Sequence, residues 1–538
     1  MYDAALTESF FPAQCDDSIE PMTIGDMLRA SAAAFADAPA LKELTYEGEI
    51  GRTWTYRDLL ADAERFGRAL EHRHGKGARI AVWANNSPEW LLLEFGAALS
   101  GVVLVTVNPS YQARELKYAL EQSRAEALYY VDSFRGNPME KIAAEACADL
   151  PAIRHRILLT DHAALFEGEN CGVSPEVRPE DVTQIQYTSG TTGFPKGALL
   201  HHEGLVRNAR DTLTRGGVKA GDVFVHNMPL FHTTGCAILA LGSLCVGATM
   251  LLAPMFDPAM IARVIERDRI AMYFGVPTMI VAMIDEVVKS GRDVSSIRSV
   301  ISGGAMVAPE LVRKSKKVLG ATIQIIYGQT EASPVVSMTW RDDSLEDLTE
   351  TIGQPLPNAD VSIRDPQTNA VLPLGVQGEI CTRGYLVMAG YNDNAEATEK
   401  AIGPDGWLHT GDLGTMDARG YLKITGRVKE MIIRGGENLF PAEIENAMLE
   451  HPDLAEVAVV GVPDEKWGEQ VACFMRAKAD ERPGAAALKA FIRERISPQK
   501  TPVYWIWVDA WPLTGSGKIQ KFKLAERFAA GAYEVLTA

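Results

Sequence analysis

Short apolar runs alternate with helix-length stretches along this chain from about residue 55 to residue 304. The stretches at 88–98 and 259–267, for example, have the length and patterning of helices. Because parallel strands need a crossover connection, usually a helix, this alternation predicts buried and largely parallel sheets covered by helices. The expected strands occupy residues 78–84, 102–107, 126–132, 156–161, 183–190, 248–254, 271–277 and 299–304.

The pattern changes at about Ile352, where short runs separated by Pro and Gly turns predict an antiparallel β region. These runs occupy residues 359–365, 378–384 and 421–427. Beyond Arg427 the expected order is β-α-β-β-α-β, which resembles a small ferredoxin-like module. Its strands are expected at 429–436, 455–463, 470–478 and 503–509, and its helices at 441–450 and 488–495. We place the domain boundary at Arg427–Lys429, which gives domains 1–427 and 428–538.

The length of 538 residues exceeds one typical hydrophobic core and predicts two or three domains. No apolar run is long enough to span a bilayer, and the acidic N-terminus lacks the basic segment of a secretory signal. The seven cysteines are scattered and form no Cys-x-x-Cys pair, so neither a disulfide framework nor a zinc site is indicated. We therefore expect a cytoplasmic protein.

The formal net charge of −17 argues against nucleic acid as a partner. An acidic protein that binds a phosphorylated small molecule must meet the phosphates with locally basic side chains or with backbone amides. The candidate phosphate-binding segments are therefore those that combine glycine, hydroxyl groups and lysine.

One such segment is the run from Tyr187 to Gly197, which follows an expected strand. It holds four Ser or Thr residues, three glycines and one lysine in eleven positions. Glycines let successive N–H groups surround an anion, hydroxyls add donors, and Lys196 supplies a mobile positive charge. It is not a Walker A loop, because Pro195 precedes the lysine and glycine follows it. A flexible surface turn is the alternative, but a turn has no use for this density of hydroxyls.

The run Thr188–Lys196 resembles the phosphate-loop signature of the adenylate-forming superfamily, which includes acyl-CoA synthetases, peptide-synthetase adenylation domains and firefly luciferase. The similarity extends from about Met22 to Leu524. It is strongest to the medium-chain acyl-CoA synthetase branch, through residues 431–445 and 512–524. With the strand pattern it implies an α/β fold: two largely parallel βα subdomains and a β-barrel-like part, followed by a small mobile α+β domain.

The resemblance implies that ATP, Mg²⁺ and coenzyme A are used. Phosphate contacts would come from Thr188, Ser189, Gly190, Thr191, Thr192, Gly193 and Lys196. Glu331 would act in catalysis and, with Thr188, hold Mg²⁺, which prefers hard oxygen ligands. The adenine and α-phosphate would lie against Gly303, Gly304, Ala305, Tyr327, Gly328, Gln329 and Thr330.

Asp412 and Arg427 suit a ribose, because a carboxylate accepts hydrogen bonds from two adjacent hydroxyls and a guanidinium donates to the same sugar. By resemblance these two residues bind the ribose. Lys518 lies in a glycine-flanked Gly-Ser-Gly-Lys-Ile run. In the superfamily this lysine bridges the carboxylate and the α-phosphate, where a fixed cation lowers the barrier to attack.

Three further assignments rest mainly on the resemblance. Lys429 matches the hinge on which the C-terminal domain rotates between the two half-reactions. The run Gly435, Gly436 and Glu437 matches the loop that lines the pantetheine passage. His232 resembles a gate beside the acyl pocket, although a packing role for this histidine is equally open.

The expected reaction joins a carboxylic acid to CoA through an acyl-adenylate, with release of AMP and diphosphate. The segments 232–244, 272–278 and 331–336 are dominated by small and apolar side chains, which favours medium-chain, branched or cyclic hydrophobic acids. The alternatives are an aryl-acid CoA ligase, an enzyme that loads a carrier-protein thiol, and a nucleotide-binding protein with a decayed site. A homodimer is left open.

Overall fold

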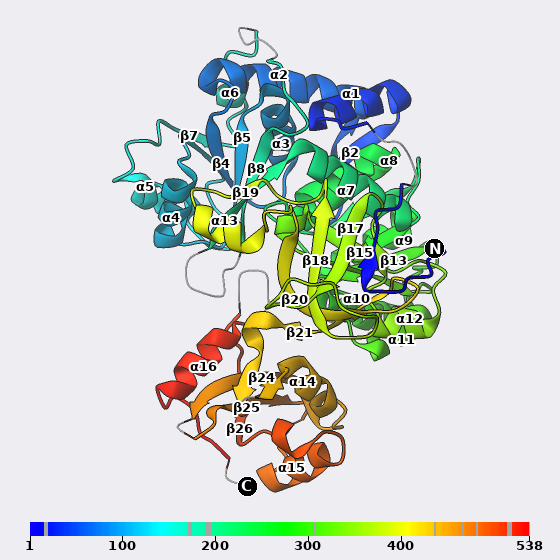
Figure 1. Ribbon diagram of the computed structural model, residues 1–538. Coiled ribbons are helices and arrows are strands. Elements are labelled where there is room, and N and C mark those ends of the chain that lie inside the picture. Colours follow the sequence, from blue (N-terminus) through cyan, green and yellow to red (C-terminus); the bar gives the residue numbers. More distant parts are fainter. Residues whose placement is uncertain are drawn as a thin grey trace.

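The computed structural model describes residues 1–15, 20–170, 175–188, 195–305, 307–434, 437–464, 466–479, 482–513 and 519–536 (Figure 1). In these ranges three sheets lie before residue 428 and a fourth lies after it. The described helices include none long and apolar enough to cross a membrane.

The first large sheet has the order β19-β9-β8-β5-β4-β6-β7 in the described residues. Its parallel strands are β4 (Arg79–Trp83), β5 (Val103–Val107), β6 (Ala127–Tyr130), β7 (His155–Leu158) and β8 (Val182–Thr188). Two antiparallel strands, β9 (Lys196–His201) and β19 (Gly390–Tyr391), complete one edge. Compared with the predicted strand 156–161, the observed strand β7 starts one residue earlier and ends three residues earlier.

The second large sheet has the order β16-β15-β14-β13-β12-β10-β11-β2-β3 over the same ranges. Its strands are β2 (Pro39–Leu44), β3 (Ile50–Thr55), β10 (Val223–His226), β11 (Thr249–Leu252), β12 (Met272–Phe274), β13 (Ser299–Gly303), β14 (Ile323–Gly328), β15 (Val335–Met338) and β16 (Gln354–Pro355). The six central strands, β14, β13, β12, β10, β11 and β2, run parallel. Antiparallel strands lie at both edges, β15 and β16 at one and β3 at the other. The two largely parallel sheets agree with the sequence prediction.

Helices cover both sheets (Figure 1). They are α1 (Ile24–Phe35), α2 (Tyr56–His74), α3 (Pro88–Ser100), α4 (Ala113–Ser123), α5 (Met139–Cys147), α6 (His162–Leu165), α7 (His202–Arg215), α8 (Gly242–Val246), α9 (Pro258–Asp268), α10 (Pro277–Ser290), α11 (Pro309–Val318), α12 (Leu345–Glu350) and α13 (Ala395–Ala401).

Helix α3 shows how the sequence sets an element in the core. Ser87 caps its first turn by accepting from the Trp90 N–H, and Pro88 occupies the first helical position, where proline is favoured. All of its side chains are buried. It approaches α2 closely where Gly96 lies against Gly67, since a Cβ on Gly96 would be 3.0 Å from the Gly67 nitrogen. Most of its side chains are apolar, as expected for a helix buried between two layers, and the buried Glu94 accepts a 2.6 Å hydrogen bond from the Gln184 side chain.

The predicted antiparallel region forms a sheet of order β1-β17-β18-β20-β21. Its strands are β1 (Phe10–Phe11), β17 (Ala359–Arg364), β18 (Gly378–Gly384), β20 (Leu408–Met416) and β21 (Leu422–Arg427). The short strand β1 comes from the N-terminus and pairs with β17, a long-range contact that the local pattern does not reveal. This sheet has its own apolar core around Phe11, Ile363 and Leu408.

The chain leaves this sheet at Arg427 and enters the short 3₁₀ turn η3 (Val428–Glu430). The elements that follow are β22 (Ile432–Arg434), β23 (Glu437–Leu439), α14 (Pro441–Leu449), β24 (Leu454–Asp464), β25 (Gly468–Ala477), α15 (Ala485–Arg493), the turn η4 (Pro498–Lys500), β26 (Tyr504–Trp507) and α16 (Lys521–Ala529). In Figure 1 they form the orange and red part at the lower end, with apolar clusters drawn from Ile432 onward.

The predicted order of strands and helices in this part is present, but the pairing departs from a ferredoxin-like sheet. Strand β26 runs parallel to β25 from Ala472 to Met475, while β22 meets the same strand at Gly468. The ten-residue strand β25 is long enough for two short strands to share it. A β22–β23 hairpin is also present, which the sequence pattern did not predict.

Candidate active site

The predicted phosphate run lies at the turn between β8 and β9. Thr188, the last residue of β8, pairs with Lys196, the first residue of β9, and its hydroxyl lies 3.4 Å from the Lys196 carbonyl oxygen. Tyr118 of α4 donates a 2.9 Å hydrogen bond to the Pro195 carbonyl. The predicted ligands Ser189, Gly190, Thr191, Thr192 and Gly193 lie outside the described residues. What the structure describes is therefore the two ends of this hairpin.

Lys196 is connected to Glu331 through a tyrosine. The Lys196 Nζ lies 4.2 Å from the centre of the Tyr391 ring, which is within reach of a cation–π contact. The Tyr391 hydroxyl donates a 2.7 Å hydrogen bond to Glu331 Oε1, and Glu331 is buried. Burial and the Glu331 charge both raise the pKa of Tyr391, so its hydroxyl keeps its proton and remains a donor.

The electrostatic surroundings of Lys196 also include the C-terminal part of the chain. Burial lowers the pKa of the Lys196 amine, and the positive charge of Lys429 lowers it further, while Glu331 acts in the opposite direction. A second positive charge near Lys196 is unfavourable in the absence of a bound anion. A polyphosphate at this point would relieve that repulsion.

Strands β13 and β14 end side by side and present the predicted adenine segment. Gly303 pairs with Ile326, and a Cβ on Gly303 would lie 2.6 Å from the Ile326 carbonyl oxygen. Gly304 has φ +77°, a left-handed conformation that favours glycine, and a Cβ there would meet no heavy atom closer than 3.9 Å. Gly304 thus faces open space, as a nearby ligand requires, whereas Gly303 is small because a neighbouring strand is close.

Gly328 is constrained in the same way as Gly303. A Cβ on Gly328 would lie 1.9 Å from the Pro334 carbonyl oxygen, where β14 turns into β15. Gln329 donates its N–H to the same carbonyl at 2.9 Å, and Thr330 begins the 3₁₀ turn η2 (Thr330–Ala332), which contains Glu331. Gly328 thus permits the close approach of Pro334 beside the turn that carries Glu331, and the nucleotide contact of Gly303 and Gly328 stays a prediction.

We expect Gly328→Ala to lower the unfolding temperature by about 4 °C or more, because a backbone carbonyl cannot move aside for the new methyl group. Differential scanning fluorimetry measures this shift. Gly484→Ala is the matched control, since a Cβ at Gly484 would meet nothing within 4 Å. Equal melting temperatures for the two variants would contradict the close approach.

The predicted ribose ligands meet across two neighbouring strands. Asp412 of β20 pairs in register with Arg427 of β21, and the Arg427 Nε lies 2.7 Å from Asp412 Oδ1. The Tyr327 hydroxyl, at the end of β14, donates to Asp412 Oδ2 at 2.9 Å. The Asp412 charge raises the pKa of Arg427, and burial followed by Asp412 raises the pKa of Tyr327. The carboxylate is therefore held between two donors.

Two sets of contacts lie in this region. Lys196 contacts Tyr391, which donates to Glu331. Tyr327, four residues before Glu331 in the chain, donates to Asp412, which pairs with Arg427. Three different sheets contribute to these contacts. The structure thus gathers into one region residues that lie up to 231 positions apart in the sequence, between Lys196 and Arg427.

Several predicted residues lie at the start of the C-terminal part. Lys429 is the middle residue of η3, the turn that begins directly after Arg427. Gly435 and Gly436 lie outside the described residues; on either side of them, Arg434 of β22 pairs with Glu437 of β23. Lys518 also lies outside them. The described flanks of its loop are joined by a bridge between Leu513 and Ile519 and by a 2.7 Å bond from the Gln520 N–H to the Pro512 carbonyl.

His232 lies just before a buried π-helix, η1 (Thr234–Leu241). Its Nδ1 accepts from the Thr234 N–H at 3.2 Å, and the His232 carbonyl accepts from the Gly235 N–H at 2.8 Å. Every residue from Gly235 to Leu241 is buried. Short π-helical segments often occur at functional sites. The contacts of His232 are compatible with a local packing role, and the gate role stays a prediction.

Sequence reasoning missed Tyr391, Glu379 and His409. Tyr391 ends a two-residue strand without a recognisable motif, and Glu379 sits inside an ordinary strand pattern. Within the described residues, one group of three metal-ligand-type side chains has all of its ligand atoms within 4.8 Å of one another. It consists of Glu379, Cys381 and His409. A thiol suits soft metals, so this group is not the predicted Mg²⁺ site.

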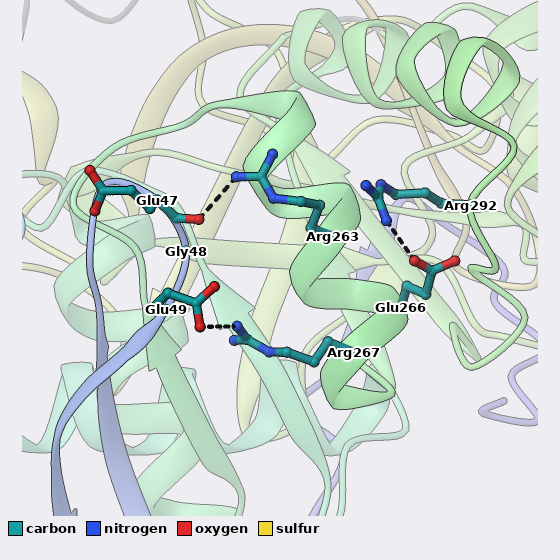
Figure 2. A pocket seen from close by; sticks show the side chains of 7 residues that line it. All are labelled: Glu47, Gly48, Glu49, Arg263, Glu266, Arg267 and Arg292. Atoms are coloured by element: carbon teal, nitrogen blue, oxygen red, sulfur yellow. Dashed lines mark hydrogen bonds and ion pairs between the residues drawn. The ribbon is translucent and has the colours of Figure 1, made fainter.

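A surface pocket of about 240 Å³ lies away from these residues, between the β2–β3 turn and α9 (Figure 2). Its arginines are already engaged: Arg267 lies 3.4 Å from Glu49, Arg292 lies 2.6 Å from Glu266, and Arg263 donates to the Glu47 carbonyl at 3.0 Å. The pocket contains none of the predicted nucleotide ligands, and its charges are balanced by its own acids.

Comparisons with known proteins agree with this geometry. Residues 28–392 match the AMP-binding enzyme family, and residues 443–518 match the AMP-binding enzyme C-terminal domain. The chain is 38% identical to the putative acyl-CoA synthetase YngI of Bacillus subtilis (strain 168), over 94% of this chain and 97% of that protein. It is 35% identical to the mitochondrial medium-chain acyl-CoA ligase ACSF2 of Bos taurus, over 94% of this chain and 87% of that protein.

Among solved structures, ATP-bound MatB from Rhodopseudomonas palustris is similar, with a TM-score of 0.84 and 27% identity over 94% of this chain and 99% of that chain. The fold and the convergent site define an adenylate-forming α/β enzyme, as the sequence predicted. The chain belongs to the AMP-binding enzyme family, and it is an AMP-forming acid–thiol ligase.

Proposed function

We propose that the enzyme activates a hydrophobic carboxylic acid with ATP and then transfers the acyl group to CoA. In the first step a carboxylate oxygen attacks the α-phosphorus of ATP, and diphosphate leaves to give the acyl-adenylate. In the second step the CoA sulfur attacks the acyl carbon, its proton is lost, and AMP leaves. The observation that carries the proposal is the two sets of contacts, from Lys196 to Glu331 and from Tyr327 to Arg427.

The positive charges fit the first step. Lys196, with Lys429 close enough to lower its pKa, offers cations where the β- and γ-phosphates would lie. Asp412 and Arg427 offer an acceptor and a donor for the ribose hydroxyls. Lys518 is proposed to stabilise the charge that develops between the carboxylate and the α-phosphate. Domains 1–427 and 428–538 are proposed to move relative to one another about Lys429.

The donor set also fits Mg²⁺. Glu331 supplies a carboxylate and Thr188 a hydroxyl, and both are hard oxygen donors. Glu331 is bonded to Tyr391, and Thr188 of β8 pairs with Lys196 of β9. These two residues would hold the ion, which when bound would neutralise phosphate charge. Tyr391 orients Glu331 by its hydrogen bond, as outer groups commonly orient metal ligands.

The substrate is proposed to be a medium-chain acid, with branched or cyclic hydrophobic acids next. The buried segment Gly235–Leu241 is apolar apart from its cysteine, and a relative at 35% identity is named as a medium-chain acyl-CoA ligase. An aryl-acid CoA ligase remains the alternative on the same fold. Transfer to a carrier-protein thiol in place of CoA is the alternative for the second step. A homodimer and the cytoplasmic location stay predictions.

Exchange of labelled diphosphate into ATP tests the first step and the choice of acid. We expect exchange to require an acid and to be fastest with hexanoic, octanoic or decanoic acid, ahead of isovaleric, cyclohexanecarboxylic and benzoic acids. Thioester formation with CoA and with a phosphopantetheinylated carrier protein then distinguishes the acceptors. Exchange that is independent of added acid would overturn the adenylation proposal, and preference for an amino acid would overturn the substrate class.

A further inference from the structure

We propose that Glu379 and His409 are a positioning pair that holds the backbone of Gly411 and so fixes Asp412 for the ribose hydroxyls of ATP. Neither residue is required to touch the nucleotide. The inference rests on the proposed function, because it needs Asp412 to be the ribose ligand. It adds Glu379 of the adjacent strand β18 and His409 of β20, the strand that also carries Asp412.

Glu379 binds the segment before Asp412 with both of its carboxylate oxygens. Its Oε1 accepts a 2.8 Å hydrogen bond from the Gly411 N–H, and its Oε2 lies 2.8 Å from His409 Nδ1. Because an ionised carboxylate can only accept, the imidazole donates through Nδ1. Glu379 is buried, with 8% of its surface exposed, so these bonds form away from bulk water. Hydrogen bonds to a charged group are the stronger kind.

The segment that Glu379 holds is irregular. Opposite β18, the register of β20 shifts so that Glu379 faces Leu413 while Cys381 faces His409. The chain advances by two residues along β18, from Glu379 to Cys381, and by four along β20, from His409 to Leu413. The extra residues of β20 form a bulge that contains Gly411 and Asp412. Gly411 has φ +73°, a left-handed conformation that few residues adopt. Bulges occur next to active sites because they re-aim a side chain.

A second set of bonds closes the bulge from the other side. The Thr410 hydroxyl donates to the Ile380 carbonyl at 2.6 Å and accepts from the Asp412 N–H at 3.1 Å. The backbone of the bulge is therefore tied to β18 at both Glu379 and Ile380. Asp412 then projects towards Arg427 and Tyr327, whose donors orient its carboxylate. A change at Glu379 displaces the bulge and so displaces this carboxylate.

The pKa of His409 is raised, chiefly by the hydrogen bond that it donates to Glu379. Burial and Arg364 lower this pKa, while the charges of Glu379 and Asp405 raise it. Cys381 Sγ lies 3.5 Å from the same Nδ1.

Binding of ATP and of 2′,3′-dideoxy-ATP, each with Mg²⁺ and measured by isothermal titration calorimetry, tests the inference. The wild-type enzyme is expected to bind ATP more tightly, because only ATP has the hydroxyls that Asp412 would accept from. Glu379→Gln keeps the side-chain shape but replaces one acceptor oxygen with an amide group. We expect it to lower ATP affinity by about tenfold or more while leaving 2′,3′-dideoxy-ATP affinity unchanged.

Two further variants complete the design. Asp412→Asn should abolish the preference for ATP directly, and His409→Gln should reduce it less than Glu379→Gln does. Glu396→Gln is the matched control, because Glu396 is exposed on α13 and pairs only with its helical neighbour Lys400 at 2.6 Å among the contacts described for it. This control should bind both nucleotides as the wild type does.

The outcomes separate the two levels of argument. If the wild type binds both nucleotides equally, Asp412 is not a ribose ligand, and that part of the proposed function falls together with the inference. If the wild type prefers ATP and Glu379→Gln keeps the full preference, the positioning inference alone is overturned. Equal losses for both nucleotides, with a lower melting temperature, would also overturn it, because they indicate a purely structural role.

Discussion

Replacement of Lys518 by alanine is expected to slow acyl-adenylate formation by about 10²–10³-fold, the cost of removing one preorganised charged donor from a transition state. Transfer of the acyl group from a supplied acyl-adenylate to CoA should stay near the wild-type rate. The reason is that two anions, the acid and the α-phosphate, meet only in the first step. In the second step a neutral or weakly charged acyl carbon meets the thiol, and the lysine is not needed.

Quenched single-turnover reactions measure the two steps separately, diphosphate release for the first and thioester formation for the second. Lys489→Ala is the control, since Lys489 is an exposed lysine on α15 of the same small domain. Equal loss in both steps would contradict the assigned role and would point to a defect in folding or in general binding.

The described contacts show how the start of α16, which follows Lys518 in the chain, is held. Lys521, at the start of α16, lies 2.7 Å from Glu430 and 2.8 Å from Glu445. Burial alone would lower the pKa of the Lys521 amine, but the two carboxylates raise it above its ordinary value. Glu430 directly follows Lys429. The segment after the proposed hinge and the flank of the catalytic loop are therefore joined by a partly buried ion cluster and should move together.

The strand pattern was sufficient to predict the large sheets, because buried parallel strands produce continuous apolar runs between helices. The runs at 102–107 and 299–304 became β5 and β13 almost unchanged. The two residues of the ribose prediction, Asp412 and Arg427, lie in recognisable motifs, and the structure pairs them; their contact with a ribose stays a prediction. Local patterning and motif chemistry thus predict elements and the residues they carry.

What the sequence could not predict depends on register and long-range contact. Tyr391 meets Glu331 across 60 positions, and nothing in the short strand β19 indicates this partner. The bulge that places Gly411 under Glu379 arises from a register shift, which alternation of apolar residues does not encode. The pairing of β26 with β25 was likewise hidden, because several sheet orders fit the same sequence of elements.

Replacement of Lys429 by proline is expected to leave acyl-adenylate formation within a few-fold of wild type and to slow acyl transfer to CoA by about 10²-fold. Proline fixes φ near −65°, a value that a 3₁₀ turn already has, and Lys429 is the middle residue of such a turn. The variant should therefore keep the described arrangement. A rotation that changes φ at this residue would be opposed, because proline locks φ, and a hundredfold slowing corresponds to about 3 kcal/mol.

In single-turnover reactions of Lys429→Pro we expect a burst of diphosphate at the normal rate. Acyl-adenylate should then accumulate on the enzyme in the presence of CoA. Lys429→Ala is the matched control, because it removes the charge that acts on Lys196 but leaves the backbone free to rotate. Two chemically different steps use one acyl carbon, so we propose that Lys518 leaves the site before the thiol enters and that a fixed hinge prevents this exchange. Unchanged steady-state turnover of Lys429→Pro would refute rotation about Lys429, and equal slowing by Lys429→Ala would assign the effect to the lost charge.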